Sequence, residues 1–97
     1  MHLYLLSQSP FNSEAFASTL ALATADDTVM LINDAVYAAL PGTAISASIA
    51  AHPARFMALD DDLLARGVDA SPSPITVIDM DAFVRLVFAA RHCITGY

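Results

Sequence analysis

The sequence contains no lysine, no tryptophan and only one cysteine, Cys93, in 97 residues. A single cysteine excludes an internal disulfide framework. The formal net charge is −6, and the basic side chains are four scattered arginines: Arg55, Arg66, Arg85 and Arg91. Tight binding to a polyphosphate backbone needs clustered cations, so we expect no direct contact with nucleic acid.

Long apolar runs are also missing. Asp, Asn, Ser or Pro interrupts every hydrophobic stretch well before it reaches a length of about 18 residues, which would predict a membrane-spanning helix. The chain starts with Met1-His2 and enters a strand-like segment, without the basic region or cleavage-type site of a signal peptide. The sequence therefore predicts a cytoplasmic protein that makes no contact with a membrane.

Hydrophobic residues are in excess. They make up 57% of the chain and charged residues only 14%, whereas about 45–50% and about a quarter are typical. We expect one domain over 1–97, and so small a domain should need more polar surface, not less. Either apolar surface is buried against other chains, or alanine enrichment inflates the figure. Large side chains favour the first explanation: Phe11, Phe16, Tyr37, Phe56, Phe83 and Phe88.

Strand-like and helix-like segments alternate along the chain. The pattern predicts strands at 2–6, 28–33, 54–59 and 75–79. It predicts helices at 13–24, at 60–66 and from Asp79 or Asp81 through about Arg91. Residues 34–40 are expected to form a short helix or turn, and residues 44–51 are weakly helical. This order predicts an α/β fold with a small, mostly parallel sheet flanked by helices. The last helix is apolar nearly all round, which is typical of a helix buried on more than one side. We expect the sheet to cover one side and a partner the other.

The most informative segment is 27–40, with the sequence DTVMLINDAVYAAL. Its β-branched, apolar run stops at Asn33-Asp34, and a run of small residues through Tyr37 follows at once, as at the carboxyl end of a buried parallel strand. In open α/β sheets this edge is where sites are built. No glycine-rich loop, metal cluster or nucleophile stands beside it in the sequence, which favours a partner subunit over an enzyme.

Candidate metal-binding groups have simpler explanations. The run Asp60–Asp62 starts a helix, where consecutive carboxylates point in different directions and interact favourably with the helix dipole. His2, His52 and His92 share no ligand spacing. We therefore expect no metal and no cofactor.

His92-Cys93 suggests a Cys/His nucleophile pair. At the end of the expected last helix, adjacent side chains point roughly 100° apart. The negative end of the helix dipole also disfavours a thiolate there. We therefore interpret Cys93 as structural or incidental, and we expect no catalytic residue in this chain.

Four segments together resemble the TusB/DsrH family of sulfur-relay subunits. The first is the expected first strand leading into Ser9-Pro10-Phe11, and the second is residues 29–40 (VMLINDAVYAAL), where the family has a strand followed by DGVYAAL. The third is residues 58–67 (ALDDDLLARG), which are similar to the family's AL-x-x-DL-x-ARG. The fourth is residues 77–86 (VIDMDAFVRL), which are similar to its IDY-x-x-FV-x-L. Each segment alone is weak, but their order and spacing in a chain of this length are specific.

The resemblance implies a three-layer DsrE-like fold and a place in a heterohexamer, with two copies each of three related subunits. The partners would be TusC-like and TusD-like subunits, and the persulfide-carrying cysteine would belong to the TusD/DsrE subunit. In the Tus branch, sulfur passes from a TusA-like donor through that cysteine to a TusE-like acceptor, toward 2-thiouridine at the tRNA wobble position. In the Dsr branch, sulfur passes to DsrC during sulfur oxidation.

The chain departs from the family pattern at several positions. Ala35 replaces the usual Gly, Met80 replaces the usual Tyr, and the chain ends in Thr95-Gly96-Tyr97, where the family commonly has a Trp motif. In the DsrH branch a cysteine lies in the first helix, and counting from Ser9-Pro10-Phe11 puts that position at Thr19. Threonine has no thiol and cannot hold a persulfide, which favours the Tus branch.

These observations predict a non-catalytic subunit of a TusBCD-like sulfurtransferase complex. The expected interface residues are Phe11, Asp34, Tyr37 and Arg66. Tyr37 is large and amphipathic at the edge of the sheet, and Arg66 either closes the helix that starts at Asp60–Asp62 or pairs across an interface. Three alternatives stay open: a DsrH-like subunit of a sulfur-oxidation relay, a stand-alone persulfide carrier using Cys93, and a stand-alone homo-oligomeric binding domain.

Overall fold

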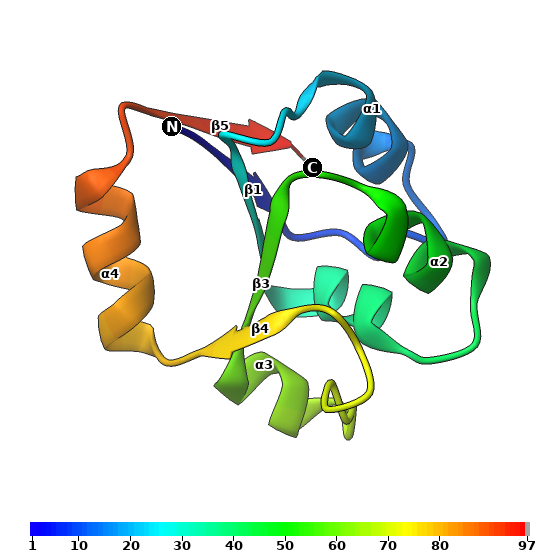
Figure 1. The fold of residues 1–97 in the computed structure, drawn as a ribbon. Coiled ribbons are helices and arrows are strands. Elements are labelled where there is room, and N and C mark those ends of the chain that lie inside the picture. Colours follow the sequence, from blue (N-terminus) through cyan, green and yellow to red (C-terminus); the bar gives the residue numbers. More distant parts are fainter. Residues whose placement is uncertain (97) are drawn as a thin grey trace.

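The computed structural model describes residues 1–96, which form a three-layer α/β structure (Figure 1). Five strands lie in the order β4-β3-β2-β1-β5, and every neighbouring pair is parallel. The elements are β1 (His2–Leu6), α1 (Ala15–Leu22), β2 (Thr28–Leu31), the 3₁₀ helix η1 (Asn33–Ala39), α2 (Ala44–Ala51), β3 (Arg55–Leu59), α3 (Asp60–Ala65), β4 (Thr76–Ile78), α4 (Met80–Ala89) and β5 (His92–Gly96). The predicted α/β class with a parallel sheet is confirmed.

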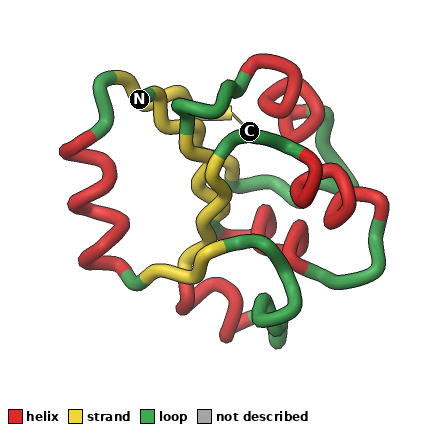
Figure 2. The backbone as a smooth tube through the Cα atoms, in the orientation of Figure 1, coloured by secondary structure: helices red, strands yellow, loops and turns green. Residues whose placement is uncertain are grey.

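The order of the strands decides which helix covers which face. The chain adds β2, β3 and β4 one after another on one side of β1, and then returns through α4 to place β5 on the other side of β1. Because crossovers between parallel strands are right-handed, this reversal of direction moves the crossover helix to the opposite face. Figures 1 and 2 show α4 alone on one side of the sheet, with α1 and α2 on the other.

The larger core lies on the α1/α2 face, by which we mean the side of the sheet that α1 and α2 cover. Alternate strand residues point into it, for example Leu6, Val29 and Phe56, and helical residues from Phe16 to Leu63 close it. Small residues of η1 are fully buried there, so this 3₁₀ helix approaches the sheet closely.

The opposite side, the α4 face, has a thinner core. Leu3, Met30 and Leu59 are buried between the sheet and α4, and Phe83 and Leu86 pack against them from α4. These helical residues are themselves only partly buried. A single ten-residue helix therefore covers this face of the sheet.

Local sequence signals explain most element boundaries. β2 ends before Asn33, whose φ of 48° lies in the left-handed region that Asn tolerates. The helix predicted at 60–66 ends at a glycine: Gly67 has φ 65°, and its N–H and that of Val68 donate to the carbonyls of Leu64 and Leu63. These two bonds form a Schellman motif, with Val68 and Leu63 in the same core.

The prediction for the C-terminal segment was wrong. The last helix was expected to run through about Arg91, but it ends at Ala89, and Ala90 is extended with ψ 138°. The Arg91 N–H donates to the Met1 carbonyl at 3.1 Å, and β5 then pairs with β1 along its whole length. Pairing with a strand some ninety residues earlier in the chain overrides the helical pattern, and no local signal encodes that partner.

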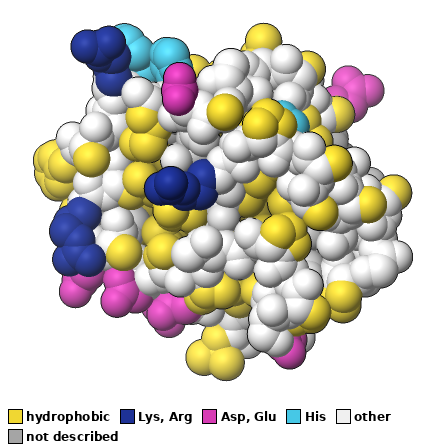
Figure 3. Space-filling model, in the orientation of Figure 1, with side chains coloured by type: hydrophobic (Ala, Val, Ile, Leu, Met, Phe, Trp, Pro, Cys, Tyr) yellow, Lys and Arg dark blue, Asp and Glu magenta, His cyan; other side chains and the backbone are white. Residues whose placement is uncertain are grey.

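The expectation that the last helix is apolar all round also needs correction. α4 begins as predicted, with the Asp79 carboxylate accepting the Ala82 N–H at 2.8 Å. One side of the helix packs on the sheet, while the other side exposes hydrophobic and charged residues together. Figure 3 shows hydrophobic, basic and acidic side chains side by side along the left edge of the molecule, over α4.

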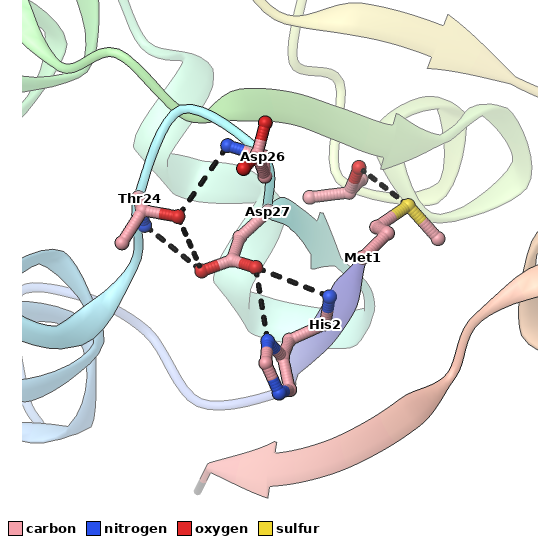
Figure 4. A network of polar contacts seen from close by, with 6 residues as sticks. Met1, His2, Thr24, Asp26 and Asp27 are labelled. Carbon is pink, nitrogen blue, oxygen red and sulfur yellow. Dashed lines mark hydrogen bonds and ion pairs between the residues drawn. The ribbon is translucent and has the colours of Figure 1, made fainter.

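A polar network holds the amino ends of the strands together (Figure 4). The buried carboxylate of Asp27 accepts the His2 N–H at 3.1 Å, the Thr24 N–H at 2.9 Å and the Thr24 hydroxyl at 3.2 Å, and it lies 3.2 Å from His2 Nδ1. The Asp27 carbonyl also accepts the Arg55 N–H at 3.1 Å. Asp27 therefore connects β1, the α1–β2 loop and β3. The bond from the Thr24 N–H, together with those from His2, lowers the pKa of Asp27 against the opposing effect of burial.

We expect Asp27→Asn to lower the free energy of unfolding by about 1–3 kcal/mol near neutral pH, since charge-assisted bonds to a buried group are lost. A carboxylate whose folded pKa is lowered stabilises the fold above its unfolded pKa of about 3.9 and loses this effect as the pH falls through the folded pKa. The difference between wild type and variant should therefore shrink in acid, as measured by urea unfolding across a pH series.

Asp26→Asn is the matched control, because the Asp26 side chain is exposed. It should change the free energy of unfolding by at most about 0.5 kcal/mol. Equal effects of the two substitutions would show that the Asp27 network does not stabilise the fold.

Candidate functional site

The carboxyl ends of the central strands meet at one edge of the sheet. At this edge the Ile32 N–H donates to the Leu6 carbonyl at 3.0 Å, which extends the contact between β1 and β2 beyond the strands themselves. Asn33 then turns the chain into η1. The loop that carries Phe11 follows β1 at the same edge.

α3 brings carboxylates to this edge because it begins directly after β3. Asp62 accepts the Asn33 N–H at 2.7 Å, whereas Asp60 accepts the N–H of Asp61 at 2.7 Å. The acidic run thus divides its carboxylates between different partners. Within residues 1–96, no three His, Cys, Asp or Glu side chains come together as ligands for a metal ion.

Arg66 at the end of α3 is held by two carboxylates. Its Nε donates to Asp34 Oδ1 at 2.8 Å, and its Nη1 lies 3.6 Å from Asp62 Oδ1 and donates to the Asp62 carbonyl at 3.3 Å. The hydrogen bond to Asp34 raises the pKa of Arg66 above its usual value, and Coulomb interactions with Asp34, Asp62 and Tyr37 act in the same direction. Arg66 therefore ties the start of η1 to α3.

The four predicted interface residues fall into two groups. Asp34 and Arg66 are in direct contact, and Tyr37 lies close enough to act on Arg66 while packing against the core of the α1/α2 face. Phe11 is separate from this group in the chain, on the loop after β1, and its side chain is 51% exposed. Their role in an interface remains a prediction.

A second cluster lies at the amino edge of the sheet, and it could not be expected from the sequence without β5. The rings of His2 and His92 stack there with centroids 5.2 Å apart and an interplanar angle of 15°, and His2 contacts Asp27. The signal that could have found β5 is the β-branched pair Ile94-Thr95, which is unfavourable in a helix and favourable in a strand.

Cys93 lies in β5, not at the end of a helix, so the argument from the helix dipole does not apply to it. Its thiol is exposed, and its register partner Leu3 points into the α4 face. His92 pairs with His2, one residue earlier in the register, and therefore points to the opposite side of the sheet. The two neighbours do not form a Cys/His pair.

Within residues 1–96, no pocket for a small molecule is found. No helix in this range is long and apolar enough to span a bilayer. The polar groups at the carboxyl edge bind one another, and the arrangement they form joins elements of the fold.

Comparison with known proteins agrees with the motifs. The family described as "DsrH like protein" matches residues 8–92. Protein TusB of Sodalis glossinidius (strain morsitans) is 39% identical over 85 residues, covering 87% of this chain and 88% of that protein. Protein TusB of Yersinia pestis (strain Pestoides F) is 35% identical over 91 residues, covering 93% of each.

The chain belongs to the TusB/DsrH family. The assignment to this family of sulfur-relay subunits, predicted from four sequence segments, is confirmed. Among solved structures, the YchN protein from E. coli superposes with a TM-score of 0.81 at 19% identity over 98% of both chains. Protein Tm0979 from Thermotoga maritima superposes with a TM-score of 0.68 at 27% identity, over 91% of this chain and 92% of that one. The three-layer DsrE-like fold expected of the TusB/DsrH family is thereby confirmed.

We expect the contact between Arg66 and Asp34 to stabilise the fold. Arg66→Ala and Asp34→Ala should each lower the midpoint of thermal unfolding, and the double variant should lose less than the sum of the two, because the same contact is removed in each. Arg66→Lys should restore only part of the loss, since lysine keeps the charge but lacks the planar fork.

Arg55→Ala is the control, because the Arg55 side chain is exposed and takes part in none of the ion pairs described within residues 1–96. Strict additivity of the two single losses would contradict a stabilising role for this pair.

Proposed function

We propose that this chain is a non-catalytic subunit of a hetero-oligomeric sulfurtransferase complex that relays persulfide sulfur toward 2-thiouridine at the tRNA wobble position. The observation that carries the proposal is the similarity to proteins named TusB at 35–39% identity over most of the chain. The complex would be a heterohexamer in the cytoplasm, with TusC-like and TusD-like subunits as direct partners. A TusA-like protein would donate the sulfur and a TusE-like protein would accept it.

The nature of the surface supports a partner subunit. Large hydrophobic side chains are exposed at several places, among them Phe88, Leu64 and Phe11. Exposed apolar side chains that gather into patches mark contacts with other proteins. Phe11, Asp34, Tyr37 and Arg66 at the carboxyl edge remain our proposed contact with the partner subunits, with the Arg66–Asp34 pair fixing the backbone that presents Tyr37.

Thr19 supports the Tus branch over the Dsr branch. It is a buried residue of α1, at the position where the DsrH branch has a cysteine. A hydroxyl cannot form the S–S bond of a persulfide. The alternative is a DsrH-like subunit of a sulfur-oxidation relay, in which the acceptor would be DsrC-like.

Co-expression with TusC-like and TusD-like proteins from the same genome tests the proposal. A tagged chain should purify with both partners in equal amounts, as measured by size exclusion with light scattering and by intact mass. Phe11→Ala should weaken this association, because the ring is half-exposed at the proposed contact. Leu22→Ala on α1, with a side chain 67% exposed, should not. Purification of the chain without either partner would reject the assembly.

The exposure of Cys93 makes the persulfide-carrier alternative testable. We expect Cys93→Ser to leave both assembly and sulfur transfer unchanged, because the relay thiol is expected on the TusD-like subunit. The measurement is sulfur transfer by a complex loaded with labelled sulfur, followed by mass spectrometry of each subunit. A persulfide on Cys93, together with lost transfer in the serine variant, would make this chain a carrier.

A further inference from the structure

The outer side of α4 carries an apolar stripe that nothing within residues 1–96 covers. Met80, Val84, Val87 and Phe88 are all exposed, and Phe88 is 85% exposed. Their spacing of four, seven and eight residues from Met80 places them along one side of the helix. The side chains that hold α4 on the sheet, such as Phe83 and Leu86, lie on a neighbouring side of the helix. We call Met80, Val84, Val87 and Phe88 the α4 stripe.

Two opposite charges lie beside one edge of the α4 stripe, the edge formed by Phe88. Asp81 and Arg85 are four residues apart on the helix and exposed, a spacing at which ion pairs often form. The ion pairs described within residues 1–96 include neither of them. Both charges therefore remain available to a partner beside the stripe.

The charges of α4 are ordered along its axis. Asp79 and Asp81 lie at its amino end, while Arg85 and Arg91 lie in or just after its carboxyl half. No Asp or Glu follows Asp81 in the sequence. The net charge of −6 opposes self-association through other parts of the surface. The two acidic and two basic side chains at α4 have a summed charge of zero, so they do not oppose it. A second α4 in the antiparallel direction would place acidic ends beside basic ends and would also oppose the two helix dipoles favourably.

We propose that α4 of a second copy of this chain packs antiparallel on the α4 stripe, about a twofold axis close to Val84. Phe88 of each copy then covers Met80 of the other, and Asp81 of each copy faces Arg85 of the other. The contact is isologous, which means that both copies contribute the same stripe and the same two charged side chains. This inference concerns contacts between copies and holds or fails independently of the sulfur-relay role.

The size of α4 limits the strength of this dimer. A ten-residue helix is about 15 Å long. A standard stable interface buries about 800 Å² on each partner, and a pair of such helices buries less. We therefore expect the isolated chain to dimerise reversibly with concentration. Additional subunits in the same assembly would raise the effective concentration of the two copies and make the contact persistent.

Sedimentation equilibrium of the isolated chain over a wide range of concentrations tests the surface. Phe88→Ser should weaken dimerisation at least tenfold. Leu64→Ser on α3 is the matched control, since Leu64 is 81% exposed and lies far from the stripe in the chain, and it should leave dimerisation unchanged. Circular dichroism confirms that both variants are folded. A monomeric wild-type chain, or equal effects of the two variants, would overturn the proposal.

A charge-reversal cycle tests the twofold geometry. Asp81→Arg and Arg85→Asp should each weaken dimerisation several-fold, and the double variant should restore it, because each reversed charge meets a reversed charge in the other copy. Asp61→Arg on α3 controls for net charge, since it changes the charge as Asp81→Arg does and should not weaken the dimer. Failure of the double variant to restore dimerisation would reject the antiparallel pairing.

Co-purification separates this proposal from the proposed function. If Phe88→Ser leaves self-association intact but prevents binding of TusC-like or TusD-like subunits, a different subunit covers the stripe. In that case the second-copy inference is wrong and the proposed hetero-oligomer stands. If Phe88→Ser abolishes self-association while both partners still bind, the second copy is confirmed as the occupant.

Discussion

The handedness of parallel crossovers is the constraint on which the rest of this structure depends. The first three crossovers run in one direction across the sheet, and the fourth runs back past all of these strands to reach the free side of β1. Right-handed connections in both directions require opposite faces. One face therefore receives α1, η1, α2 and α3, and the other receives α4 alone. The thin core of the α4 face and the exposed outer side of α4 are direct results of this single reversal.

Local signals in the sequence were sufficient for the first four strands and the elements between them. The stop of β2 at Asn33 and the end of α3 at Gly67 follow from residues that tolerate positive φ, and the start of α4 follows from the Asp79 cap. Family motifs covered these same segments, so the fold class and the family could both be predicted. Arg66 was expected either to close α3 or to pair at an interface. Within the chain it donates to the Asp62 carbonyl of α3 and pairs with Asp34 of η1, and its role at an interface stays a prediction.

Contacts between residues distant in sequence could not be predicted in this way. Neither the Arg66–Asp34 pair nor the stacking of His2 on His92 has a signature in sequence spacing, because each joins elements that only the sheet order brings together. The same limit explains the error at the C-terminal segment. The β-branched pair Ile94-Thr95 favours a strand, but nothing local specifies its partner, which is the free side of β1. For the same reason, Cys93 was expected at the end of a helix but lies on β5 with its thiol exposed.

The pairing of β5 with β1 has a consequence for how the protein is made. Residues 2–6 leave the ribosome about ninety residues before their partner residues 92–96. Without β5, β1 is an edge strand whose free backbone groups invite pairing with other chains. Closing a loop of this length is also entropically costly and slows folding. Any partly folded chain that lacks β5 therefore exposes an aggregation-prone edge, which disappears when β5 pairs with β1.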